Sequence, residues 1–142
     1  MPRVPTTQAG RRRRNGERGE SLIEFAFASM MFFASIFAVL EFGQVIWRYN
    51  LVSNLAQEGA RYAAVHGLNS GSPMSEAQIG TYVTSRSIGM AVTVTTPGGA
   101  PNTILPGNMV EVRVVHNLSI GGGILPLWSF PMQSTGRMMI TR

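Results

Sequence analysis

The hydrophobic pattern changes twice along the first half of the chain. Residues 1–19 hold almost no aliphatic side chains and are rich in arginine, glycine and proline, which is typical of an unfolded segment. The stretch 25–40 carries no charge, and the wider stretch 22–47 corresponds to about 39 Å of helix. That length exceeds a hydrocarbon core of about 30 Å, so the pattern predicts a transmembrane helix over 20–47.

Small and apolar residues continue at steps of three and four beyond this segment. The spacing predicts that the helix extends outside the membrane as an amphipathic helix over 48–67, because Gly67, Gly71 and Pro73 end the pattern. The expected stripe consists of Val45, Tyr49, Val52, Ala56, Gly59 or Ala60, and Ala63. Its alanines and glycines favour close approach to another surface.

The stretch 68–142 alternates between turn-rich and periodic segments. Ser75 and Gln78 form a capping box, which predicts a short helix ending near Ser87. Alternation predicts strands at 90–96, 109–116 and 136–141. The middle strand should bury the face formed by Val110, Val112 and Val114. We therefore expect an α+β protein: a long N-terminal transmembrane helix that continues into an amphipathic helix, with a small antiparallel three-strand sheet and a short helix outside the membrane.

The apolar stretch 120–130 allows two interpretations. Its glycines and prolines predict an exposed loop that contacts a membrane or a partner subunit through Leu125, Leu127, Trp128 and Phe130. Alternatively the loop folds back into the core, which the small size of the domain favours.

The net charge of +5 belongs to the leader alone. Residues 1–19 carry six arginines against one glutamate, whereas 20–142 carry six arginines and six glutamates. The outer domain therefore lacks the basic face that nucleic-acid binding requires, and no nucleic-acid partner is expected. The arginine block before an apolar helix places the N-terminus in the cytoplasm and the C-terminal domain outside. A buried core helix, a cleaved secretory signal and a twin-arginine signal each fit this N-terminus less well.

Catalytic chemistry has few candidate residues in this chain. There is no cysteine, and the two histidines, His66 and His116, have no acidic or cysteine neighbour in sequence with which to build a site. His66 lies near the predicted helix end, where a capping or dipole role is expected. We predict no catalytic residues, no metal site, no cofactor and no enzymatic activity.

Glu24 stands at the start of the apolar run, five residues after Gly19. A carboxylate there needs a partner, because a charge at the bilayer centre costs up to about 2.5–3.5 kcal/mol. If the chain is cut after Gly19, a new α-amine appears at Glu20, and the amine of one subunit can neutralise Glu24 of its neighbour. The run from Gly19 to Phe25 resembles the processing site of type IV pilins and pseudopilins. That resemblance implies cleavage between Gly19 and Glu20 by a prepilin peptidase, and subunit contacts in the membrane through Glu24 and Phe25.

A second resemblance covers roughly residues 18–67. Together these motifs resemble the TadE-like pseudopilins, minor pilin-like components of the tight adherence (Flp) pilus assembly system. The residues that carry it are Glu24 and Phe25, then Glu41, Phe42 and Gly43, then Glu58, Gly59, Ala60, Arg61, Tyr62 and Ala63. The implied partners are a prepilin peptidase, other pilin or pseudopilin subunits and the inner-membrane assembly platform. Gln44 departs from the pattern, since many relatives have arginine there.

Several motif residues also have simpler explanations. Glu41 fits either the outer membrane interface or a subunit contact, and Glu58 and Arg61 are spaced to pair on one helix face. Gly43 and Gly59 mark either close helix packing or simple tolerance. The rival function is an uncleaved single-pass membrane protein of the bacterial inner membrane whose outer domain binds an envelope partner or ligand. Processing after Gly19 distinguishes the two.

Overall fold

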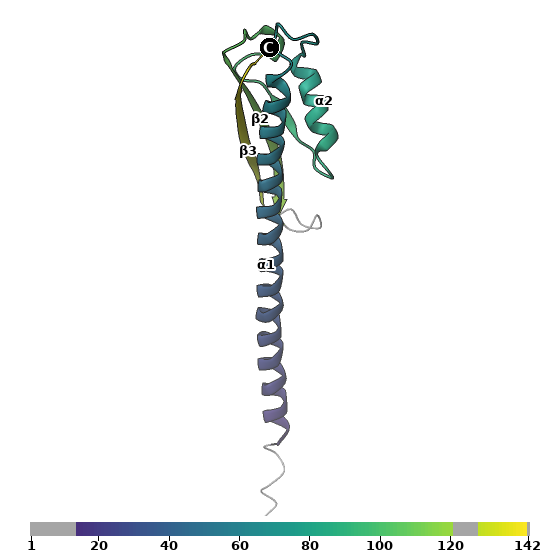
Figure 1. Ribbon diagram of the computed structural model, residues 1–142. Coiled ribbons are helices and arrows are strands. Elements are labelled where there is room, and N and C mark those ends of the chain that lie inside the picture. Colours follow the sequence, from purple (N-terminus) through teal and green to yellow (C-terminus); the bar gives the residue numbers. More distant parts are fainter. Residues whose placement is uncertain (1–13, 121–127, 142) are drawn as a thin grey trace, which may run out of the picture. The chain divides into compact units, whose positions relative to one another are not determined.

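The described part of the chain forms two α-helices, a short 3-10 turn and a three-strand antiparallel sheet, so the predicted α+β class is confirmed (Figure 1). The computed structural model describes residues 14–120 and 128–141, with the side chains of 19–119 and 128–141. The elements are α1 (Arg14–Ala64), α2 (Glu76–Arg86), β1 (Thr93–Thr95), a 3-10 turn (Pro101–Thr103), β2 (Met109–Ile120) and β3 (Trp128–Met139). The chain divides into two compact units, Met1–Phe42 and Gly43–Arg142, and α1 contributes residues to both.

Within the first unit, the described residues belong to α1. The helix begins at Arg14, so the prediction of an unfolded leader is wrong for 14–19, while 1–13 lie outside the described residues. Gly16 and Gly19 are poor helix formers, but adding one residue to an existing helix costs far less than starting a new one. The apolar helix therefore extends backwards into the leader.

The second unit has its core along the C-terminal part of α1. Val52, Ala56, Ala60 and Ala63 are buried there, as the stripe predicted. Tyr49 belongs to the predicted stripe but is 54% exposed. The difference arises because the core cluster of this unit begins only at Leu51, so the preceding turn of helix has no core to join.

Helix α2 matches its prediction closely. Ser75 is the N-cap, and its backbone N–H donates to Oε1 of Gln78 at 2.9 Å, one half of the expected capping box. Ile79 and Val83 are fully buried on its inner face. Two side chains four residues apart therefore anchor the helix to the core.

The sheet has the order β1-β2-β3, with every pair antiparallel. Val110, Val112 and Val114 are fully buried, which confirms the predicted inner face of β2. Figure 1 shows the β2–β3 hairpin running alongside the C-terminal part of α1, with α2 close to the same part of the helix. The core thus lies between one helix face and one sheet face.

The strand limits differ from the predicted ones. β1 is shorter than 90–96, β2 continues four residues past His116, and β3 begins at Trp128 instead of Gly136. Pro131 interrupts the β pattern in the sequence, yet it pairs with Asn117, because β3 is an edge strand whose outer N–H groups need no partner.

The apolar residues at the start of β3 do not enter the core. Trp128 is 78% exposed and Phe130 is 38% exposed, so the interpretation that this segment folds back is wrong for both. The core-facing side of β3 is therefore exposed to solvent near Trp128. Leu125 and Leu127 lie outside the described residues.

Candidate functional site

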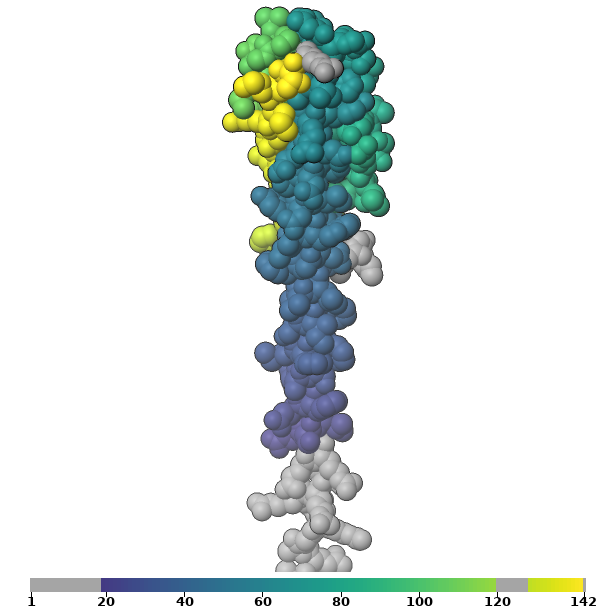
Figure 2. Space-filling model, viewed as in Figure 1, coloured from purple at the N-terminus to yellow at the C-terminus, as the bar shows by residue number. Residues whose placement is uncertain are grey.

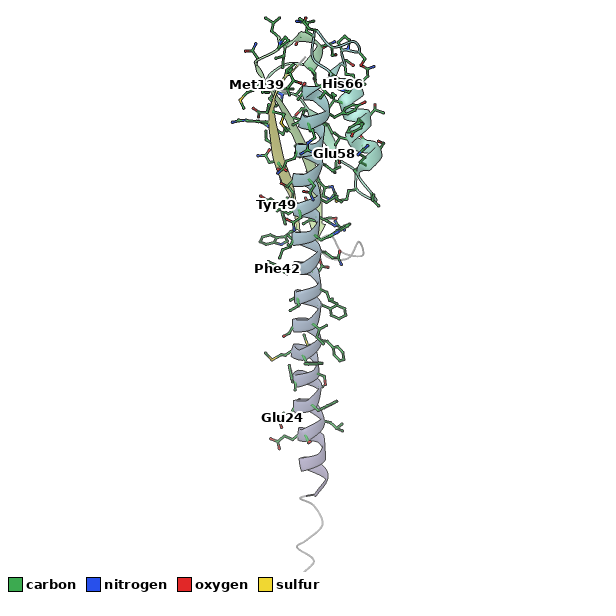
Figure 3. The ribbon with its side chains drawn as sticks, viewed as in Figure 1. Glu24, Phe42, Tyr49, Glu58, His66 and Met139 are labelled. Carbon is green, nitrogen blue, oxygen red and sulfur yellow. The ribbon has the colours of Figure 1, made fainter. Side chains whose placement is uncertain are left out.

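The N-terminal motif lies on the open surface of α1. Gly19, Glu20 and Glu24 are exposed, and Phe25 is 71% exposed. Among the described residues, Glu24 forms no hydrogen bond or ion pair (Figure 3). The structure therefore leaves the predicted cleavage and contact residues without partners inside this part of the chain.

The apolar part of α1 is unburied throughout its most hydrophobic window, and it is long and apolar enough to cross a membrane. The exposed apolar surface is large, because five phenylalanines are each at least 56% exposed: Phe25, Phe27, Phe32, Phe33 and Phe37. Burying one such side chain is worth about 1.5–3 kcal/mol. Left in water, this surface would favour aggregation, so it requires a lipid or protein environment.

The middle motif falls where the two compact units meet in sequence. Glu41 is half-buried, and Phe42 is 66% exposed. A side chain added at Gly43 would meet no described atom within 4 Å. Within this chain, therefore, close packing does not explain Gly43.

The third motif, by contrast, holds α2 and the sheet against α1. A Cβ on Gly59 would lie 2.8 Å from Cγ2 of Val83 on α2 and 3.1 Å from Cγ1 of Val112 on β2. Ala60 and Ala63 are fully buried in the same core. Close packing, one of the two explanations for Gly59, is the one that the structure supports.

The charged and aromatic residues of this motif contact α2. Glu58 forms an ion pair with Arg86 and accepts a hydrogen bond from the Tyr82 hydroxyl at 3.4 Å. Tyr62 stacks on Tyr82 with ring centroids 3.6 Å apart and planes within 1° of parallel. The expected pair of Glu58 with Arg61 is wrong, because Arg86 of α2 pairs with Glu58 instead.

Arg86 completes the cluster from the other side of Tyr82. Its guanidinium carbon lies 4.3 Å from the ring centroid, within range of a cation–π contact. Burial is the largest influence on Tyr82 and raises the pKa of its phenol; Glu58 adds to the increase, and Arg86 opposes it. The sequence contained no signal for this cluster, since Glu58 and Arg86 are 28 residues apart.

An open groove of about 840 Å³ runs beside this cluster. Its lining mixes charged, polar and aromatic side chains from α1, α2 and β3: Asn54, Gln57, Glu58, Arg61, Tyr62, Val65, Tyr82, Thr135, Gly136, Arg137 and Met138. The lining includes no histidine or cysteine, and the described residues contain no cluster of metal-ligating side chains. It offers hydrogen bonds and charge to a protein surface.

Both histidines have structural contacts. Nδ1 of His66 lies 2.8 Å from the Tyr62 carbonyl oxygen in the last turn of α1, which confirms the predicted capping role. His116 is buried, and its Nδ1 lies 2.8 Å from the Ala91 carbonyl oxygen. A ring nitrogen that faces a carbonyl oxygen must be the donor, so each histidine carries a proton on Nδ1.

One long unburied apolar helix followed by a small α+β unit is the arrangement of a single-pass or pilin-like membrane protein. Within it, residues 19–61 match the model of the family described as TadE-like protein, so this segment is a TadE-like domain. The match begins at Gly19 and ends at Arg61, so it covers the first two motifs and the third from Glu58 to Arg61. No curated protein and no solved structure matches the chain.

Proposed function

We propose that this protein is a pilin-like structural component, a pseudopilin or minor pilin, in the assembly of tight adherence pili. The observation that carries the proposal is the TadE-like domain at 19–61, which starts at the predicted cleavage residue and contains the unburied apolar helix. The family points to a structural role and away from catalysis, and the groove beside Glu58 has the chemistry of a contact surface.

In this proposal a prepilin peptidase cuts between Gly19 and Glu20 on the cytoplasmic side of the inner membrane. The leader removed contains the positively charged arginine block, and the product begins with a protonated α-amine at neutral pH. Glu20 and Glu24 are four residues apart in α1, so they lie on one helix face. The amine of one subunit then pairs with Glu24 of the next, which sets the register between neighbouring helices.

The exposure of Glu24 and Phe25 supports this pairing. An ionised carboxylate beside lipid is expensive, whereas the same group paired with an amine in a helix bundle is neutralised. The expected partners are therefore other pilin or pseudopilin subunits, together with the assembly platform that holds them in the inner membrane.

Cleavage is tested by intact mass and N-terminal sequencing of the membrane-extracted protein, made with and without a cognate prepilin peptidase. We expect a mature N-terminus at Glu20 only when the peptidase is present. Gly19→Leu should abolish this product, whereas Gly16→Leu, a matched change within the leader, should leave it. An intact leader in the presence of an active peptidase contradicts the proposal and favours the uncleaved single-pass protein.

The role of Glu24 needs a separate measurement, because cleavage and assembly are different steps. Glu24→Gln keeps the shape of the side chain and removes its charge, so we expect normal cleavage and a loss of surface pili. Glu17→Gln is the control, since it removes a charge from the leader, which cleavage discards before assembly. Pilus yield that is unchanged by Glu24→Gln would show that this charge does not set the register.

A further inference from the structure

The inner face of the β2–β3 hairpin is covered at one end and open at the other. Along the first half of β3, exposure rises from 7% at Met132 to 38% at Phe130 and 78% at Trp128. These three residues alternate along one strand and therefore lie on the same face. Gly136 shows which face it is, because a Cβ there would point into the backbone of α1 at Ala56.

The opposite face of the same segment is polar or lacks a large side chain. Ser129, Pro131 and Gln133 are all exposed on it. The end of the hairpin thus has an apolar inner face and a mostly polar outer one, as the core-facing part of a sheet does. Nothing among the described residues covers Trp128.

Two contacts fix the direction of β3 along α1. The backbone N–H of Thr141 donates to the carbonyl of Ala64 at 3.1 Å, and Gly136 lies against Ala56. Five strand residues therefore correspond to eight helix residues. Carried on at this ratio, the eight residues from Gly136 back to Trp128 correspond to about 13 helix residues, because the strand is inclined to the helix axis and advances along it by less than its full rise per residue.

Trp128 consequently lies at about the level of Gly43 on α1, about one helical turn from Trp47. Figure 2 shows the start of β3, in olive-yellow, near this level of the helix. Trp47 is 57% exposed and Tyr49 is 54% exposed. The two tryptophans of the chain therefore lie about 6 Å apart along the helix axis, at the predicted outer end of the membrane span.

Charge is absent from this end of the hairpin. From Asn117 to Gly136 the sequence contains no aspartate, glutamate, lysine or arginine. Tryptophan and tyrosine at the end of an apolar helix are typical of the region where lipid headgroups meet hydrocarbon, and Arg48 between Trp47 and Tyr49 suits the same region. The pattern favours lipid over a second protein surface.

We infer that the start of β3 lies in the headgroup region of the outer leaflet, with Trp128 inserted at about the depth of Trp47. The inference rests on the membrane anchor of the proposed function. It makes the small domain a second point of contact with the bilayer, so that the outer unit is held against the membrane surface before assembly.

The test uses the full chain in phosphatidylcholine vesicles and the fluorescence of single tryptophans. Trp47→Phe leaves Trp128 as the only tryptophan, and Trp128→Phe leaves Trp47. Phosphatidylcholine with brominated acyl chains quenches tryptophans at the membrane. We expect Trp128 to be quenched within about twofold of Trp47, as two residues of one aromatic belt should be.

Leu105→Trp, made in the chain that lacks both native tryptophans, is the matched control. Leu105 is 56% exposed and lies in the turn bonded to Ile140, at the end of the unit where α1 stops. We expect no quenching there. Strong quenching at this position would mean that the whole unit lies on the bilayer, which overturns the inference of a hairpin contact.

The remaining outcomes separate the inference from the proposed function. Quenching of Trp47 without quenching of Trp128 overturns the inference and leaves the membrane anchor intact. Quenching of neither residue contradicts the anchor itself. A second quencher, aqueous iodide, shows whether Trp128 is shielded from water. If this shielding disappears when the protein is diluted in excess lipid, a second copy of the chain covers Trp128 and the lipid contact is wrong.

Discussion

Gly136 offers the sharpest test of the packing in the second unit, Gly43–Arg142. A Cβ at this position would lie 2.2 Å from the carbonyl oxygen of Ala56, 2.6 Å from its carbonyl carbon and 2.9 Å from the backbone N of Gln57. All three atoms are backbone, so no rotamer change relieves the clash, and Gly136→Ala must push β3 away from α1. Overpacking of this kind costs about 2–3 kcal/mol. For a unit of about 100 residues, Gly43–Arg142, that lowers Tm by about 10–20 °C.

The same substitution should act differently at two other glycines. At Gly80 in α2 the nearest atom to a new Cβ is 4.0 Å away, so alanine gains about 0.5–1 kcal/mol from its helix propensity. At Gly59 the close atoms belong to side chains of Val83 and Val112, which can move, so we expect a loss smaller than at Gly136.

Thermal unfolding of the full chain in detergent, followed by near-ultraviolet circular dichroism, measures this series. The signal of the stacked tyrosines reports tertiary packing and does not depend on the apolar helix. From lowest to highest Tm, the expected order is Gly136→Ala, Gly59→Ala, the unmodified chain and Gly80→Ala. A Gly136→Ala protein that unfolds at or above the temperature of the unmodified chain would refute the close approach of β3 to α1.

Three further predictions concern the cluster between the helices and the core. Glu58→Gln should lower the free energy of unfolding by about 0.5–1 kcal/mol, because its ion pair with α2 is about half exposed. Arg61→Gln, which lines the same groove, should change the free energy of unfolding by less than about 0.5 kcal/mol. Equal losses for Glu58→Gln and Arg61→Gln in denaturant titrations would contradict the pairing of Glu58 with Arg86. Because burial raises the pKa of Tyr82, its protonated phenol stabilises the fold fully below about pH 10, and this stability is lost as the pH rises through the folded pKa. Tyr82→Phe should therefore flatten the alkaline loss of stability, and parallel pH profiles would argue against it. Ile79→Ala should cost about 2–5 kcal/mol because this side chain is fully buried, whereas Ile88→Ala, at 79% exposure, should cost less than about 0.5 kcal/mol; similar losses at both sites would count against the assigned core.

Local signals explain which elements could be predicted from the sequence. The capping box at Ser75 and the alternation of Val110 to Val114 depend on neighbours within a few residues, and both elements formed where they were expected. The first half of β3 carries no such signal, because Pro131 breaks the pattern and pairing with β2 supplies what the segment lacks. A strand of this kind is defined by its partner.

The site shows the same division. The run Glu58 to Tyr62 was recognisable as a motif, but its contacts were not, since Arg86 and Tyr82 come from an element that folds back from more than twenty residues away. The role of Gly136 could not be predicted from the sequence for a related reason. A glycine needed for close approach looks in sequence like any other glycine, and only the backbone of Ala56 distinguishes it.

The bond between Thr141 and the carbonyl of Ala64 has a consequence for the order of folding. It joins the last turn of α1 to a residue 77 positions later, and Ile140 beside it belongs to the core. A contact of such long sequence separation forms only after the whole intervening chain has been synthesised. Under the proposed topology, the apolar helix enters the bilayer early, whereas the unit Gly43–Arg142 completes its fold only when Thr141 has crossed the membrane.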